Sequence, residues 1–206
     1  MQAIPSPGPD IRRTIGPLRT IFWGGLICIF DLKINNFDLL HDLVGTIMIA
    51  WGVFALGGIK VHESYAKAMR FVQTVVALSC LTTLMDQFGY PRSSFISTLL
   101  SLLGTVEMIA IVVFCVAMRW LCIHAELVES TRSWRTTTLL FTFIYLIPLG
   151  LFYCAAAIAI ATGNSFSIQL GPAGLLLLPV LFAPLVHLFV STSRMKNEAA
   201  RDGGAA

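Results

Sequence analysis

The sequence predicts an all-α, polytopic membrane protein with six transmembrane helices and both termini in the cytoplasm. Of its 206 residues, 56% are hydrophobic and 12% are charged, against roughly 45–50% and 25% in an average soluble domain. The apolar residues form blocks such as 95–118 and 136–161, each long enough to cross about 30 Å of hydrocarbon. The basic residues alternate in number from one connection to the next. These three observations predict the fold class.

The predicted spans occupy most of the chain. Residues 1–16 carry Pro5, Pro7 and Pro9, which resist helix formation, so we expect an irregular cytoplasmic tail there. The transmembrane domain is expected over 17–192 and a cytoplasmic tail over 193–206. The first span follows arginines, as a signal peptide would, but no cleavage site follows it, so we interpret it as uncleaved. The six predicted spans are 18–30, 39–56, 68–85, 95–118, 136–161 and 170–190.

Charge in the connections supports this number of spans, because Lys and Arg are retained on the cytoplasmic side of short loops. Alternate connections carry three basic residues each, whereas the opposite connections together carry only Lys33 and Arg92. A miscounted helix in the middle of the chain would mix the two groups. We therefore predict that both termini face the cytoplasm and that the protein lies in the cell membrane. The cytoplasmic groups are Arg12, Arg13 and Arg19; Lys60, Lys67 and Arg70; Arg119, Arg132 and Arg135; and Arg194, Lys196 and Arg201.

Several functional classes find no support in the sequence. The basic residues do not gather on one soluble segment, which argues against nucleic-acid binding. The five cysteines adjoin apolar blocks without the spacing of a zinc site, and His187 has no second histidine within a span to share a haem. The common nucleophile, zinc-protease, phosphate-loop and dinucleotide motifs are absent. We therefore expect no cofactor and no bound metal, and no positive sign of an enzyme is found.

Glu107 is the most informative single residue. It lies about twelve residues into the fourth span, near the middle of the bilayer at 1.5 Å per residue. A carboxylate at that depth costs about 3 kcal/mol on insertion scales, so Glu107 is expected to face other helices and to be either protonated or paired. Gly104, one turn earlier, predicts close contact with a neighbouring helix. Glu107 is then either a proton or cation site, or a structural donor to a Ser or Thr of another helix.

Acidic residues gather on the predicted outer side of the membrane. Asp38 and Asp42 fall in the first turn of the second helix, where the helix dipole and free N–H groups favour negative charge. Asp31 and Asp86 close the first and third helices, where the dipole is unfavourable, so each is expected to need a cationic neighbour such as Lys33 or Arg92. The set of Asp31, Asp38, His41, Asp42 and Asp86 is therefore either an outer cluster that attracts cations or a group of residues with structural roles at helix ends.

Two further segments carry predictions. Pro148, Pro179 and Pro184 interrupt the last two spans, where each removes a backbone hydrogen bond and is expected to kink its helix. Carbonyl groups freed in this way can line a site. The connection from Trp120 to Trp134 mixes charges with two tryptophans, and it is expected to form a short amphipathic interfacial helix or a surface for a partner.

The segment 30–45, which reads F-D-L-K-I-N-N-F-D-L-L-H-D-L-V-G, resembles a motif of small bacterial multi-pass membrane proteins. Their pattern is roughly F-D-x-x-I-x-G-F-D-I-L-P-D-x-x-G. Asn36 replaces its glycine and His41 its proline. The resemblance covers the first two spans, implies a bacterial inner-membrane protein, and suggests no activity.

Three functional hypotheses follow. The first is a small-solute or ion transport or permeation protein, with Glu107 as its intramembrane ionisable group and the proline-kinked helices as pathway elements. The second is a non-catalytic subunit or assembly factor of a larger membrane complex, either with partner proteins or as a homo-oligomer. The third is a membrane enzyme, for which only the outer set of Asp31, Asp38, His41 and Asp42 offers several polar groups at one depth.

Overall fold

The computed structural model describes residues 12–29, 39–87, 94–163 and 173–202. Within these ranges the chain is helical and contains no strand, which confirms the all-α class. Six continuous helices are present in this described part, as expected, because α5, η1 and α6 follow one another without a break. The elements are α1 (Arg12–Ile29), α2 (Leu39–Gly57), α3 (Glu63–Gln87), α4 (Ser94–His124), α5 (Val128–Phe141), the π-helical turn η1 (Thr142–Leu146), α6 (Ile147–Thr162) and α7 (Ala173–Asp202).

Three of these helices are long and apolar enough to cross a membrane, counting the described residues alone. They are Glu63–Met85, Thr98–His124 and Val128–Ala159, and Asp42–Gly57 is a shorter apolar helix. The first and sixth predicted spans adjoin segments outside the described ranges, so their full crossing stays a prediction. The protein is thus a helical chain with at least three segments suited to a bilayer.

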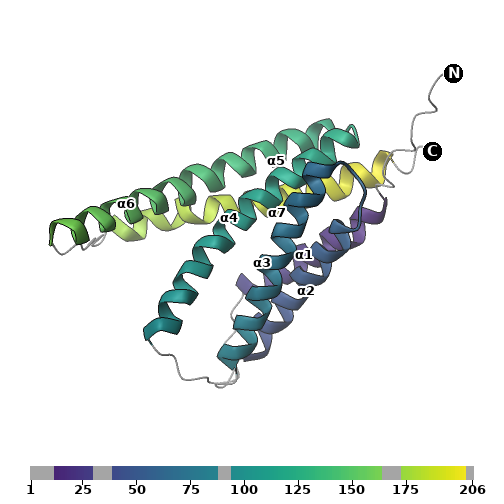
Figure 1. Ribbon diagram of the computed structural model, residues 1–206. Coiled ribbons are helices and arrows are strands. Elements are labelled where there is room, and N and C mark those ends of the chain that lie inside the picture. The colour runs from purple at the N-terminus through teal and green to yellow at the C-terminus, as the bar shows by residue number, and fades with distance from the viewer. Residues whose placement is uncertain (1–11, 30–38, 88–93, 164–172, 203–206) are drawn as a thin grey trace.

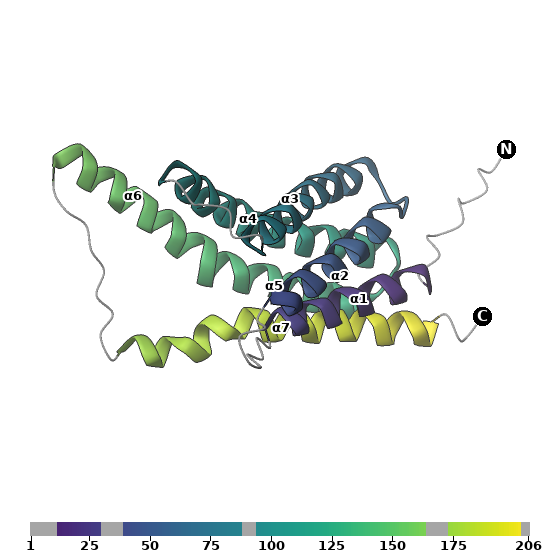
Figure 2. The same cartoon turned by 90° about the horizontal axis from the view of Figure 1, so that it is seen from below.

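The helices form a ring through their contacts. Each helix packs against the next one along the chain from α1 to α5, and α7 closes the ring by packing against both α5 and α1. The start of α1 and the end of α7 lie on the same side of the molecule (Figure 1). In both views α6 and the beginning of α7 extend away from α1, α2 and α3 (Figures 1 and 2). From α1 to α5, helices that are adjacent in the sequence are therefore also adjacent in space.

Glycines set the close approach of α1 to α2. A Cβ atom at Gly45 would lie 2.7 Å from the backbone oxygen of Gly24, and a Cβ at Gly52 would lie 2.7 Å from the oxygen of Pro17. Real Cβ atoms essentially never come closer than 3.0 Å to such atoms. Small residues of this kind let helix backbones approach one another in membrane bundles. The backbones of α1 and α2 therefore lie too close for any larger residue at Gly45 or Gly52.

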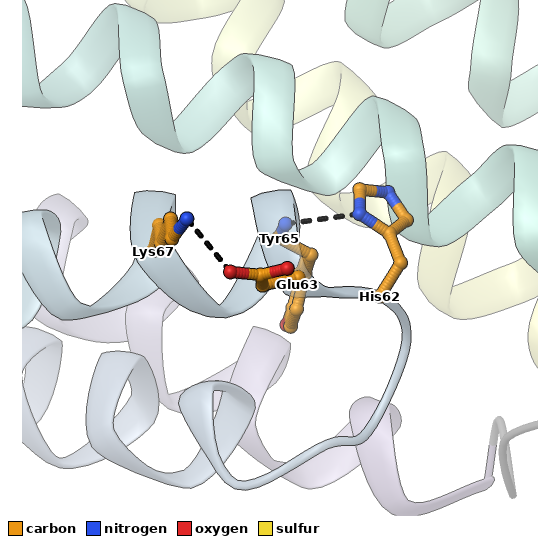
Figure 3. A network of polar contacts seen from close by, with 4 residues as sticks. All are labelled: His62, Glu63, Tyr65 and Lys67. Carbon is orange, nitrogen blue, oxygen red and sulfur yellow. Dashed lines mark hydrogen bonds and ion pairs between the residues drawn. The ribbon is translucent and has the colours of Figure 1, made fainter.

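The connection from α2 to α3 is held by side chains at the start of α3 (Figure 3). The Nδ1 atom of His62 accepts a hydrogen bond from the Tyr65 backbone N–H at 3.1 Å, so His62 caps α3. The Tyr65 hydroxyl donates to the Leu56 carbonyl at 2.8 Å and thus satisfies a carbonyl at the end of α2. Glu63 and Lys67 form an ion pair at 2.7 Å, but both side chains are largely exposed, so it stabilises the helix little.

The best-packed part of the core lies where α4 ends and α5 begins. Trp134 is fully buried, its ring meets Phe114 edge-on at 5.9 Å, and its indole N–H donates to the Met195 sulfur at 3.3 Å. Glu198 of α7 caps α5 from outside, because its carboxylate accepts the backbone N–H of Glu129 at 3.2 Å and that of Ser130 at 2.8 Å. The Ser130 hydroxyl donates to the same carboxylate.

This region corrects the expected interfacial helix between Trp120 and Trp134. Instead of a separate element, α4 continues to His124 and α5 begins at Val128, with a tight turn between them in which Glu126 has φ of 59°. Such a left-handed residue commonly ends a helix. The two tryptophans lie on different helices, and burial of Leu121 and Leu127 in the core holds the turn in place.

The π-helical turn η1 lies directly before Pro148. The Ile147 N–H donates to the Thr142 carbonyl, five residues back, instead of four. Proline has no N–H and its ring clashes with the preceding turn of an α-helix, and the wider π turn gives that ring space. The irregularity that Pro148 predicts is therefore taken up by η1, while α5 and α6 remain one continuous helix.

Candidate functional site

A cavity of about 410 Å³ lies inside the ring, between α1, α2, α3, α4 and α7. This volume is within the range of about 300–1,000 Å³ that is usual for small-molecule sites. Most of the wall is hydrocarbon. The residues that line it are Ile21, Phe22, Gly25 and Cys28 of α1; Thr46, Ile49 and Val53 of α2; Val72, Val75, Val76, Ser79 and Thr83 of α3; Glu107, Ala110, Ile111 and Phe114 of α4; and Leu185, Leu188, Phe189 and Thr192 of α7.

Glu107 is the only acidic residue among the described residues that line this cavity, and no Lys, Arg or His lines it. It lies in the middle of α4, about 20 Å from the start of that helix at 1.5 Å per residue. The structure thus places the carboxylate among neighbouring helices, as its cost in lipid predicts. Gly104 does not make the expected close contact, because a Cβ atom there would meet nothing within 4 Å.

The partner of Glu107 is a serine of the neighbouring helix. The Ser79 Oγ lies 2.6 Å from the Glu107 Oε1 atom and 3.0 Å from the carbonyl oxygen of Val75. A hydroxyl has one proton, so it donates to only one of these oxygens at a time. Both contacts are hydrogen bonds together only when Glu107 is protonated and donates to Ser79. When Glu107 is ionised and takes the Ser79 proton, the Val75 carbonyl loses that partner.

The other hydroxyl groups of the cavity use their protons within their own helices. Thr46 donates to the Asp42 carbonyl at 2.6 Å, Thr83 to the Ser79 carbonyl at 2.9 Å, and Thr192 to the Leu188 carbonyl at 2.9 Å. What these groups still offer to a ligand is oxygen lone pairs. Thr46 and Thr83 lie toward the predicted outer ends of α2 and α3, whereas Thr192 lies toward the end of α7.

Three aromatic rings form part of the cavity wall. Phe22 of α1 and Phe189 of α7 meet edge-on with their centroids 5.2 Å apart. Phe114 of α4 lines the cavity and is buried against Trp134. Edge-on aromatic pairs of this kind stabilise a contact by about 0.5–1.5 kcal/mol beyond the area that they bury.

The predicted outer acidic cluster is only partly within the described residues. Asp42 is exposed in the first turn of α2, where an acidic residue was expected. Asp31 and Asp38 lie outside the described residues. His41 and Asp86 fall within α2 and α3, near the expected helix ends, but their side chains are not described. The cluster therefore stays a prediction.

Pro179 and Pro184 both lie inside α7, as expected. Pro184 supplies no N–H to the turn before it, and in that turn the Leu181 carbonyl accepts a hydrogen bond from the Tyr145 hydroxyl of η1. This hydrogen bond thus joins the π-helical turn η1 to the turn of α7 that precedes Pro184. The kinks at Pro179 and Pro184 stay predictions.

A second polar cluster lies on the other face of α7, against α5, and sequence reasoning missed it. The Thr137 hydroxyl is 2.8 Å from the His187 Nδ1 atom and 2.7 Å from the Ser191 hydroxyl, which is 2.7 Å from the Ser133 hydroxyl. Ser133, Thr137 and Ser191 are buried. The signal was the spacing of four residues from Ser133 to Thr137 and from His187 to Ser191, which puts each pair on one helix face.

Comparisons with models of protein families, with curated proteins and with solved structures find no match to this chain. The residues above therefore have to be interpreted from their own geometry and chemistry.

Proposed function

We propose that this chain is a small transport or permeation protein of the cell membrane in which Glu107 binds a proton or another cation. It crosses the membrane six times with both termini in the cytoplasm, as the alternation of basic residues predicts. The single observation that supports this function most is the position of Glu107 in the wall of a cavity that five helices line. An intramembrane ionisable residue beside a cavity is a common mark of an ion or solute pathway.

The Ser79 contact supports a two-state site. In the protonated state, Glu107 donates to Ser79 and Ser79 donates to the Val75 carbonyl, so the neutral site is satisfied without a ligand. In the ionised state, Ser79 neutralises part of the charge, and the Oε2 atom has no hydrogen-bond partner among the described residues. A cation in the cavity then compensates the charge that the proton left behind. One carboxylate thus exchanges a proton for a cation.

Movement of α7 would open the cavity on the side where Phe22 and Phe189 meet. Phe189 packs against Phe22 in the cavity wall, and it follows Pro184 by little more than one helical turn. A helix that lacks a backbone hydrogen bond bends at that point more easily than a regular helix does. Bending at Pro184 would separate the two rings.

Flux in reconstituted vesicles tests this function. The purified chain is placed in lipid vesicles, and proton flux is followed with an enclosed pH-sensitive dye under an imposed cation gradient. We expect Glu107→Gln to reduce the flux tenfold or more, because the amide cannot bind the proton or balance a cation. Glu126→Gln is the matched control, since Glu126 is exposed in the turn between α4 and α5. Equal flux through both variants would contradict the proposal.

A second candidate, a non-catalytic subunit of a larger complex, is favoured by α6. This helix extends beyond the ring and is apolar along its length, with Leu151 and Ile158 each 65% exposed. Lipid covers such a surface as well as a protein does. Gentle purification with mass spectrometry separates the two candidates. A stoichiometric partner would favour the subunit, and a protein free of partners would favour transport.

A further inference from the structure

The polar groups of the cavity around Glu107 accept hydrogen bonds but do not offer them. Three hydroxyl groups already donate their protons to carbonyls of their own helices: those of Thr46, Thr83 and Thr192. The Glu107 carboxylate, when ionised, is purely an acceptor. No basic side chain lines the cavity in the part of the chain that the structure describes. An anion would find neither a positive charge nor a free donor there, whereas a positively charged donor finds several lone pairs.

The apolar part of the wall excludes a bare metal ion as the best-fitting occupant. A hard cation such as Ca²⁺ takes about six to eight oxygen ligands at 2.3–2.6 Å. The side-chain oxygens of this cavity are instead spread over four helices, and the remaining wall is aliphatic and aromatic. The volume of about 410 Å³ is also much larger than one ion needs. An occupant with a small charged end and a sizeable apolar body matches both features.

We propose that this cavity binds amphiphilic amines, each with a protonated nitrogen that carries at least one N–H and with an apolar, preferably aromatic, body. The inference rests on the proposed function and names the class of cation that Glu107 exchanges for a proton. The ammonium group donates to the Oε2 atom of Glu107, while Ser79 holds Oε1 at 2.6 Å. Charge-assisted hydrogen bonds of this kind are the strong ones in proteins.

The apolar body of the amine extends from Glu107 toward the phenylalanine rings of the cavity wall. Ala110 follows Glu107 by three residues on the same face of α4 and also lines the cavity, and its small methyl group takes up little of the space beside the carboxylate. Phe22, Phe114 and Phe189 also line the cavity. Aromatic rings pack against an apolar body, and their faces also attract a cation within about 6 Å.

A matched ligand series tests the class of ligand on the unchanged protein. The probe is 4-phenylbutylamine, compared with neutral 4-phenylbutanol and anionic 4-phenylbutyrate. Binding to the full chain in lipid nanodiscs is measured by calorimetry, with empty nanodiscs as the control for partition into lipid. We expect the alcohol to bind about tenfold to a hundredfold more weakly than the amine, because it cannot form the charge-assisted bond, and the anion more weakly still. Equal affinity for amine and alcohol would overturn the proposal.

Two substitutions locate the site. Glu107→Gln is expected to weaken amine binding by about tenfold to a hundredfold and to leave alcohol binding unchanged. Glu126→Gln is expected to change neither. Ala110→Leu fills the space beside the carboxylate, and it should weaken the amine and the alcohol alike. Unchanged amine binding in both Glu107→Gln and Ala110→Leu would place the ligand elsewhere and overturn the assignment.

The binding and flux measurements fail independently of each other. Amine binding that depends on Glu107, without any flux in vesicles, would support the binding site and overturn transport. Proton flux that depends on Glu107, with no preference of the cavity for amine over alcohol, would support transport and overturn the amine class. The ligand series needs no variant, so a variant that does not fold leaves the proposal testable.

Discussion

Replacing Gly45 by alanine tests how closely α1 approaches α2. The added Cβ atom would lie 2.7 Å from the Gly24 backbone oxygen and 2.5 Å from the Cys28 sulfur. The sulfur can turn aside, but the backbone oxygen moves only with α1 itself. Since ordinary contacts begin at 3.4 Å, α1 would have to shift by about 0.7 Å. That shift would also displace Cys28, which lines the cavity.

Gly104→Ala is the matched control for this prediction, because a Cβ atom at Gly104 meets nothing within 4 Å. Both substitutions gain the same helix propensity, about 0.8–1.0 kcal/mol in a helix interior. The difference between the two variants therefore isolates the steric cost at Gly45. Overpacking of a tight contact typically costs about 1–3 kcal/mol, so we expect Gly45→Ala to be less stable than Gly104→Ala by about that amount.

The assay is unfolding of the purified protein in mixed micelles with increasing denaturing detergent. Fluorescence of the four tryptophans, of which Trp134 is fully buried, reports the transition. The free energies of unfolding of the two variants are compared with that of the unchanged chain. If Gly45→Ala were as stable as Gly104→Ala, the backbones of α1 and α2 would not approach each other as closely as described. The position of α1 in the cavity wall would then be wrong.

Two further substitutions test contacts of α7 by the same unfolding assay. Glu198→Ala removes a carboxylate that accepts two backbone N–H groups at the start of α5, and it should cost about 1–3 kcal/mol. Glu129→Ala keeps the backbone N–H that Glu198 accepts, so it should change the free energy of unfolding little. A similar loss of stability in both variants would contradict the capping of α5 by Glu198. Thr137→Val removes the hydroxyl that contacts His187 and Ser191, and about 1–3 kcal/mol is again expected. Thr136→Val, on the exposed face, is its control, and an equal cost there would show that the buried cluster contributes nothing specific.

The sequence predicted the helices better than their ends. Apolar block length and the placement of basic residues are local properties, and they correctly indicated an all-α chain of six helices. The ends of α4 and α7 extend past the predicted spans, to His124 and Asp202. The α4 extension buries Leu121 and Cys122 in the core, and the polar α7 extension is held by the contact from Glu198 to α5. Composition along the chain carries no signal for such a contact.

The sequence by itself also identified Glu107, because a lone carboxylate in an apolar block is conspicuous wherever the helices are placed. Only the tertiary structure decided its partner, since Ser79 is one of many hydroxyl residues and lies 28 positions away. The structure likewise decided which glycines matter: Gly45 meets a backbone and Gly104 meets open space. The physical reason is the same in both cases. Residue type determines how much free energy it costs to expose a side chain to lipid. Which neighbour that side chain contacts depends on how whole helices rotate and approach one another.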